Sequence, residues 1–317
     1  MKALPLSAVI AAINGRIVRG DIAKNVSKST KRSENLSENC LFFALSGPPA
    51  AMAIPAGCTV VTDDPDWSSA FGNITTIYVP NVQQAIDSFM VLYRSLFDIP
   101  VIGVTGTSGK TQTKEMIKCI LQDYSIQATC FSNNGLSLNL DYLLGIQEST
   151  QAAIFEMSAA YPGSLAACCR CFQPTVCVIM NIDDGGTLGR QSAAQYSQTP
   201  GNLLESLTRC HTLIINGDDE NINRLDLTSY SGTLIRFGTT NRCDLQAADI
   251  RPAAGGIHAA LHYGSETQNL FLPGQDRLQL YNALAAIAAA AAAGLDIDWK
   301  AAGARLAQFQ DTSPQKT

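Results

Sequence analysis

The segment Val101–Thr111 constrains the fold of this chain most strongly, because an apolar strand, a glycine loop and a helix start follow one another directly. Gly106 and Gly109 allow the backbone to turn its N–H groups toward one point, and the helix that begins near Lys110 directs its positive dipole end to the same point. Lys110 can reach the outer phosphates of a nucleotide, and the Thr111 hydroxyl can bind Mg²⁺. The segment therefore predicts a phosphate loop formed by Thr105, Gly106, Thr107, Ser108, Gly109, Lys110 and Thr111.

The spacing of this loop departs from the strict G-x4-G-K-[ST] pattern, because Val104 stands five positions before Gly109. The prediction rests instead on the strand that precedes the loop and the helix that follows it. The alternative is a glycine-rich turn between a strand and a helix that binds no ligand.

The segments after the phosphate loop alternate between strand-like and helical patterns. The expected strands are 101–104, 152–155, 175–180 and 212–215. With a helix at 114–121, this alternation implies βαβ units and a parallel sheet covered on both faces. From 250 to 271, short polar–apolar alternations with glycines indicate antiparallel hairpins. An alanine-rich helix at 281–293 follows them.

The first hundred residues have the character of a smaller unit. The expected strands there are 41–45, 58–62 and 76–80, and a helical pattern covers 82–96. The predicted fold class is therefore α/β. It comprises a small mixed N-terminal domain at 1–98 and a P-loop doubly wound, mainly parallel sheet with an antiparallel appendage at 99–310. The tail at 311–317 is expected to be disordered.

Charge and composition exclude several classes of protein. A net charge of −5 and a pI near 5.2 argue against nucleic acid as a partner, because phosphate backbones require clustered Lys and Arg. The longest apolar stretch, Tyr281–Leu295, is mostly alanine and too short to span a membrane. Without a secretion signal at the N-terminus, a cytoplasmic location is expected. Among the 10 cysteines only Cys168, Cys169 and Cys171 cluster, with no histidine nearby, so we interpret the cysteines as small buried residues.

The residues of the phosphate loop and several later segments resemble one family. The sequence T-G-T-S-G-K-T-Q-T-K-E-M-I at 105–117 resembles the ATP loop of the Mur ligases, which add amino acids to the UDP-muramoyl precursor of peptidoglycan. The continuation Thr113-Lys114-Glu115 looks most like the member that adds the D-alanyl-D-alanine dipeptide. Further similar segments occur in the family's order at 41–47, 132–134, 156–159, 162–163, 173–182, 216–219 and 281–286.

This resemblance implies roles for particular residues and implies ATP and Mg²⁺ as cofactors. Lys110 would hold the γ-phosphate, Thr111 and Glu156 would hold Mg²⁺, and Asn282 would lie near the adenine. Lys110 and Glu156 would then be the catalytic residues. The residues themselves agree for Glu156, which follows an apolar strand at the carboxyl edge of the expected sheet, where ligands of such folds bind. The alternative for Glu156 is a solvated charge at the end of a strand.

The sequence also departs from the family's pattern. Gly186 stands where the family has a metal-holding histidine, and Pro200 stands where it has a lysine. Tyr161 replaces the histidine of its H-P-G segment, and Ser29-Thr30-Lys31 is all that corresponds to its D-S-R uridine motif. The N-terminal domain is abbreviated after Gly47, and the chain ends at Thr317, before the family's third domain.

Two acidic residues offer a replacement for the missing histidine. Asp183 and Asp184 carry hard oxygen ligands and follow the strand that ends at Ile182. We hypothesise that one of them holds a second Mg²⁺. The alternative is that 183–186 is a polar turn without a ligand.

Three functions remain open from the sequence. The first is an ATP-dependent acid–amino-acid ligase of peptidoglycan precursor synthesis, acting on a UDP-muramoyl peptide or another carboxylate, with a protein partner that supplies the third domain. The second is a catalytically impaired ATP-binding regulator or scaffold that partners a complete ligase. The third is another P-loop enzyme, such as a relative of folylpolyglutamate synthetase.

Overall fold

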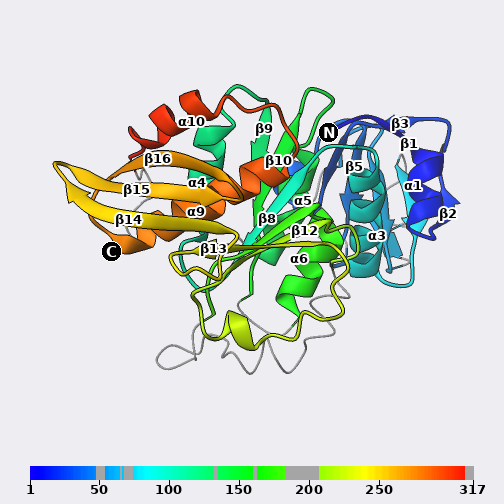
Figure 1. Ribbon diagram of the computed structural model, residues 1–317. Coiled ribbons are helices and arrows are strands. Elements are labelled where there is room, and N and C mark those ends of the chain that lie inside the picture. The colour runs from blue at the N-terminus through cyan, green and yellow to red at the C-terminus, as the bar shows by residue number, and fades with distance from the viewer. Residues whose placement is uncertain are drawn as a thin grey trace. The chain divides into compact units, whose positions relative to one another are not determined.

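The structure is a computed structural model, which describes residues 1–47, 54–64, 66–67, 74–130, 135–159, 163–182 and 207–310 (Figure 1). The chain forms two compact units. The first contains Met1–Asp98 and Asn139–Ser149, and the second contains Ile99–Leu138 and Thr150–Thr317.

The first unit is built on a mixed five-stranded sheet in the order β2-β7-β6-β5-β4, in which only the β2–β7 pair is antiparallel. These strands are β2 (Arg16–Arg19), β4 (Lys28–Thr30), β5 (Cys40–Phe43), β6 (Thr59–Thr62) and β7 (Thr75–Tyr78). A separate antiparallel pair joins β1 (Leu4–Pro5) to β3 (Asn25–Val26). The helices are α1 (Leu6–Ala12), the 3-10 turn η1 (Ser33–Asn35), α3 (Val82–Ser95) and α5 (Asn139–Leu144).

Helix α3 packs onto this sheet through an aromatic stripe. Asn81 caps its N-terminus by accepting a hydrogen bond from the Gln84 N–H at 2.9 Å. Phe89 and Tyr93 are fully buried at a four-residue spacing, and the Phe89 ring lies 5.4 Å from that of Phe43 on β5. The helical pattern predicted at 82–96 therefore forms a core helix of the first unit.

The segment Asn139–Ser149 lies within the range predicted for the second domain, yet it packs with the first unit. Helix α5 contacts α3, and the Tyr93 hydroxyl donates a 2.7 Å hydrogen bond to the carbonyl of Ile146. Leu140, Leu143 and Ile146 are buried in this packing. The boundary at residue 98 is thus not the only point at which the chain passes between units.

The second unit is built on a nine-stranded sheet in the order β16-β15-β14-β13-β12-β11-β8-β10-β9. The strands from β9 to β14 in this order are parallel, and β15 pairs antiparallel with β14 on one side and with β16 on the other. Their bounds are β8 (Val101–Thr105), β9 (Ile126–Ala128), β10 (Ala152–Glu156), β11 (Val176–Ile179), β12 (Thr212–Asn216), β13 (Thr233–Gly238), β14 (Leu245–Ala253), β15 (Gly256–Tyr263) and β16 (Glu266–Pro273). Its helices are α4 (Lys110–Ile120), α6 (Ser164–Phe172), α9 (Arg277–Ala292) and α10 (Trp299–Leu306), with 3-10 turns η2 (Leu136–Leu138) and η3 (Ile222–Arg224).

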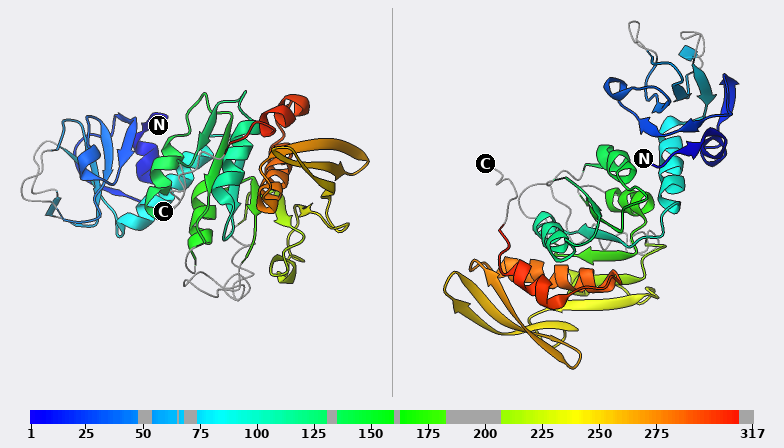
Figure 2. Two further views of the ribbon diagram at one scale, coloured as in Figure 1. Left: turned by 90° about the vertical axis from the view of Figure 1, so that its left-hand side faces the viewer. Right: turned by 90° about the horizontal axis from the view of Figure 1, so that it is seen from above.

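Helices cover both faces of this sheet, which confirms the predicted doubly wound class (Figure 2). Ile154 of β10 belongs to the core that α4 and α9 share with the sheet. Its neighbour Phe155 points to the opposite face, because successive strand residues alternate, and there it stacks on Phe172 of α6 at 4.1 Å. The alanines of α9 let that helix lie close to β11, β12, β13 and α4.

The sequence predicted that the chain does not span a membrane and that its cysteines are buried, and the structure bears on both. No helix within the described residues is long and apolar enough to cross a membrane.

Seven cysteines are buried: Cys40, Cys58, Cys168, Cys169, Cys171, Cys177 and Cys210. Burial raises the pKa of the Cys177 thiol well above its usual range, so that this thiol stays protonated at neutral pH.

Candidate phosphate-binding site

The phosphate loop lies at the carboxyl end of β8, between the ends of β10 and β11 in the middle of the parallel sheet. Strand β8 is completely buried, and α4 begins at Lys110. Gly106 and Gly109 have φ angles of 134° and 80°, which side chains with a Cβ rarely adopt. The strand, loop and helix start predicted from the sequence are therefore present with the expected bounds.

Asn181, at the end of β11, holds the loop in place. Its carbonyl accepts a hydrogen bond from the Thr107 N–H at 3.1 Å, and its side-chain Oδ1 accepts from the Ser108 N–H at 2.8 Å. Its Nδ2 donates to the Ser108 hydroxyl at 3.0 Å. This role was missed from the sequence, although a polar residue at the end of a buried strand next to β8 is a usable signal.

Lys110 bends back over the loop. Its Nζ donates hydrogen bonds to the carbonyls of Gly106 at 2.6 Å and Thr107 at 3.3 Å. The ammonium group therefore lies over the loop at the start of α4, where the positive end of the helix dipole adds to its charge. An anion bound at this position would be attracted by both the Lys110 ammonium and the positive end of the α4 dipole.

Glu156, the last residue of β10, lies beside the loop with its side chain 1% exposed. Its Oε2 accepts a hydrogen bond from the Thr111 hydroxyl at 3.1 Å, and its Oε1 lies 3.0 Å from Nζ of Lys114. This burial excludes the alternative of a solvated charge. Two hard oxygen atoms, Thr111 Oγ1 and Glu156 Oε2, thus lie next to each other at the carboxyl end of the sheet, and oxygen atoms of this kind are the ligands that Mg²⁺ prefers.

The remaining two predicted metal ligands, Asp183 and Asp184, lie outside the described residues. The same holds for Tyr161, Gly186, Pro200 and the segment 132–134. The second Mg²⁺ site proposed at Asp183 or Asp184 therefore stays a hypothesis from the sequence.

Asn282 of α9 is fully buried behind the start of α4. Its Nδ2 donates a short hydrogen bond to Oε1 of Gln112, and its amide oxygen lies so close to Gly109 that a Cβ there would overlap it. That oxygen has no hydrogen-bond partner among the described residues. Its amide group thus lies against α4 and the phosphate loop, and the predicted contact with adenine stays a prediction.

A hydrogen-bonded carboxylate lies at the same edge of the sheet, at Asp218 after β12. It accepts hydrogen bonds from the hydroxyls of Thr239 at 2.8 Å, Thr240 at 2.7 Å and Tyr281 at 2.8 Å. Burial raises the pKa of the Asp218 carboxyl, but the hydrogen bonds from Thr240, Thr239 and Tyr281 together outweigh it and lower the pKa to about 2. This cluster ties the start of α9, one residue before Asn282, to the ends of β12 and β13.

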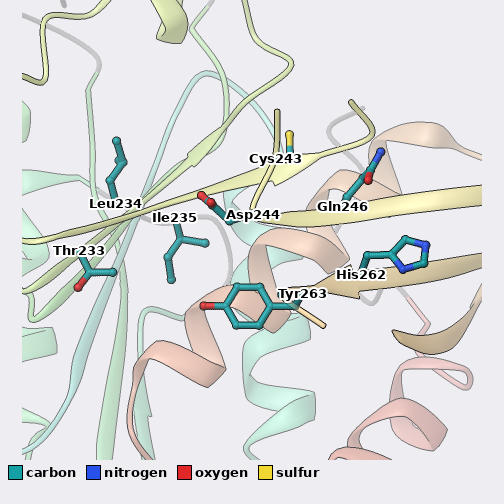
Figure 3. A pocket seen from close by; sticks show the side chains of 9 residues that line it. Thr233, Leu234, Ile235, Cys243, Asp244, Gln246, His262 and Tyr263 are labelled. Carbon is teal, nitrogen blue, oxygen red and sulfur yellow. The ribbon is translucent and has the colours of Figure 1, made fainter. Parts of the chain in front are cut away.

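A hollow of about 650 Å³ lies elsewhere in the unit (Figure 3). It is lined by Thr233, Leu234, Ile235, Cys243, Asp244, Gln246, His262, Tyr263 and Gly264. These residues include no lysine or arginine, and their one carboxylate, Asp244, already accepts the backbone N–H of Arg236 at 2.7 Å. The hollow shares no residue with the phosphate loop, so we do not include it in the site.

Comparisons with known proteins agree with this geometry. The family described as "Mur ligase middle domain" matches residues 104–290. The UDP-N-acetylmuramoyl-tripeptide–D-alanyl-D-alanine ligase of Bacillus subtilis (strain 168) is 28% identical over 271 residues, which cover 83% of this chain and 58% of that relative. The ligase of the same name from Escherichia coli (strain K12) is 24% identical and covers 96% of this chain and 68% of its own length.

Solved structures share the fold. MurF from Acinetobacter baumannii matches 98% of this chain and 68% of its own, with a TM-score of 0.82 and 21% identity. MurF ligase from Thermotoga maritima, determined in complex with ADP, matches 89% of this chain and 66% of its own, with a TM-score of 0.70 and 19% identity. The chain thus spans about three-fifths to two-thirds of the length of these proteins.

Proposed function

The chain belongs to the Mur ligase family, and from this premise we propose that it binds ATP with Mg²⁺ for an ATP-dependent acid–amine ligation in peptidoglycan precursor synthesis. The resemblance to the member that adds D-alanyl-D-alanine is confirmed by the relatives that carry this name. The observation that carries the proposal is the phosphate loop itself, with Lys110 above it and Thr111 and Glu156 beside it.

The loop supplies the contacts for the phosphates. Thr107 and Ser108 donate their N–H groups to Asn181, so these two groups hold the loop's shape. The first N–H groups of α4 have no acceptor within the helix, and we assign them to phosphate oxygens. The Lys110 ammonium would leave the carbonyls of Gly106 and Thr107 for the γ-phosphate. Thr111 and Glu156 would hold Mg²⁺, and its charge would neutralise the phosphate oxygens.

In the proposed reaction a carboxylate oxygen of the substrate attacks the γ-phosphorus, and ADP leaves with the electrons of the broken P–O bond. The resulting acyl phosphate is then attacked at carbon by an amine, and inorganic phosphate leaves. Lys110 and the N–H groups of α4 would stabilise the negative charge on the transferred phosphoryl group. The names of the relatives support a UDP-muramoyl peptide as the carboxylate and a D-alanyl-D-alanine dipeptide as the amine.

The activity of a whole ligase is part of this proposal, because residues 1–317 span 58% of the Bacillus subtilis relative. We propose that the groups that position the amine come from protein outside residues 1–317, in the same polypeptide or in a partner. The cytoplasmic location expected from the sequence fits this role and stays a prediction.

Calorimetric titration with a non-hydrolysable ATP analogue and Mg²⁺ tests the proposal. We expect micromolar binding that Lys110→Ala abolishes, because the substitution removes the charge above the loop. Lys118→Ala is the matched control, since that lysine lies on the same helix and pairs only with Glu115 in the described contacts. Absence of binding by the native chain, or equal binding by Lys110→Ala, would refute the assignment. Binding without ADP release on addition of carboxylate and amine would favour the regulatory alternative.

A further inference from the structure

Lys114 is a buried charge that the proposed reaction does not use directly. Its side chain is 0% exposed, and oxygen atoms of three described residues lie within 3.0 Å of its Nζ. They are the Thr129 carbonyl at 2.8 Å, Oε1 of Glu115 at 3.0 Å and Oε1 of Glu156 at 3.0 Å. Burying an ammonium group is costly unless it is paired with an opposite charge and hydrogen-bonded, as Lys114 is here.

The two oxygens of Glu156 are held differently by one face of α4. Thr111 and Lys114 are three residues apart on the helix and therefore point the same way. The Thr111 hydroxyl donates to Oε2 at 3.1 Å, and the Lys114 ammonium lies 3.0 Å from Oε1. Among the described residues no donor meets Oε1 at hydrogen-bonding angles, so the nearby positive charge is what compensates it.

The backbone of Glu156 is fixed in the same network. Its N–H donates to Oγ1 of Thr129 at 2.7 Å, and the carbonyl of Thr129 accepts from Lys114. The end of β9, the end of β10 and the second turn of α4 are thereby joined around one carboxylate. The carboxylate cannot rotate without breaking contacts to both Thr111 and Lys114.

This arrangement limits how a divalent cation can bind. A cation at Oε1 would face the Lys114 ammonium at short range and be repelled, whereas Oε2 lies beside the Thr111 hydroxyl and the phosphate loop. Mg²⁺ takes one oxygen from each carboxylate at about 2.0–2.1 Å, in an octahedron completed by water and phosphate. Ca²⁺ accepts both oxygens of a carboxylate at roughly 2.3–2.6 Å and prefers 6–8 ligands.

We propose that Lys114 is a positioning residue that confines a divalent cation to Oε2 of Glu156 and thereby selects Mg²⁺ over Ca²⁺. The inference rests on the proposed function, because it assumes that nucleotide and metal bind at the phosphate loop. It concerns residues that the structure brings together from α4, β9 and β10.

Titration of a non-hydrolysable ATP analogue in the presence of Mg²⁺ or of Ca²⁺ tests this selection. For the native chain we expect tighter analogue binding with Mg²⁺. In Lys114→Met we expect the ratio of Mg²⁺-supported to Ca²⁺-supported affinity to fall by about tenfold or more, the scale on which groups that orient a metal ligand act. Lys118→Met is the control and should keep the native ratio, because Lys118 is 40% exposed and pairs with Glu115 alone in the described contacts.

Lys114→Gln covers the case in which Lys114→Met does not fold, because it removes the charge and keeps a polar group; it should show the same fall in ratio. An equal loss of affinity with both metals, or an unchanged ratio, would overturn the proposal and leave Lys114 a structural residue. Equal analogue affinity of the native chain with Mg²⁺ and Ca²⁺ would overturn it without any variant. Failure of the native chain to bind the analogue with either metal would instead refute the proposed function, and this inference with it.

Discussion

Gly109 and Gly163 offer a matched pair for measuring how tightly the phosphate loop is packed. Gly109 precedes α4 with φ 80° and ψ −11°, and Gly163 precedes α6 with φ 82° and ψ −10°. An added Cβ would overlap the Asn282 amide at Gly109, whereas no described atom lies within 4 Å of a Cβ at Gly163. The two positions therefore share the backbone strain and differ in the space available.

The strain alone makes Gly163→Ala cost about 1–2 kcal/mol of unfolding free energy. Gly109→Ala carries the same strain plus overpacking against a buried side chain, which adds about 1–3 kcal/mol. At about 2–4 °C per kcal/mol for a domain of this size, Gly109→Ala should lower the melting temperature by several degrees more than Gly163→Ala. Circular dichroism melts of the two variants and the native chain measure this difference.

The overlap can be removed separately. In an Asn282→Ala background the space beside Gly109 is open, so Gly109→Ala should cost no more there than Gly163→Ala does in the native chain. Equal melting temperatures for the two single variants would refute the packing described for Asn282. If Gly109→Ala still cost more than Gly163→Ala in the Asn282→Ala background, that excess would also refute this packing.

Two further substitutions test the groups around the site. Asn181→Ala removes side-chain hydrogen bonds to the Ser108 N–H and hydroxyl, each worth about 1 kcal/mol, so affinity for an ATP analogue should fall by roughly 30-fold. Asn223→Ala, whose amide donates to Gly217 instead, should leave that affinity unchanged in the same titration. Asp218 has a folded-state pKa of about 2 against an ordinary value of 3.8, so its stabilising effect is complete above pH 4 and is lost as the pH falls toward 2. Melting temperatures at pH 6 and pH 3 should therefore differ less in Asp218→Asn than in the native chain, and an identical difference in both would contradict the hydrogen-bonded carboxylate.

The sequence predicted those features that depend on neighbouring residues. The strand at 101–104, the glycines at 106 and 109 and the helix start at Lys110 are encoded within one short segment, and the structure places them as expected. Alternation of apolar strands and helices gave the mainly parallel sheet for the same reason. The spacing of apolar residues that marks a strand or a helix repeats within a few residues, so it can be recognised without knowledge of the fold.

Features that depend on distant contacts were not predicted. The hydrogen bonds between Asn181 and Ser108 join residues that are 73 positions apart, and no residue near Asn181 indicates which loop it contacts. Lys114 has the polarity of a surface residue on α4, and only the ends of β9 and β10 make it a buried counter-ion. The segment 139–149 carries ordinary helical spacing, and its partner α3 lies more than 40 residues earlier in the chain.

The placement of Asn139–Ser149 has a consequence for how the protein is made. A ribosome releases the chain from the N-terminus, and domains usually fold as they emerge. Here the first unit cannot bury the surface of α3 around Tyr93 until Ile146 has been synthesised. By then β8, α4 and β9 of the second unit have already been made, while their neighbours β10 and β11 have not. The two units must therefore mature in an interleaved order, with the phosphate loop synthesised before either core is complete.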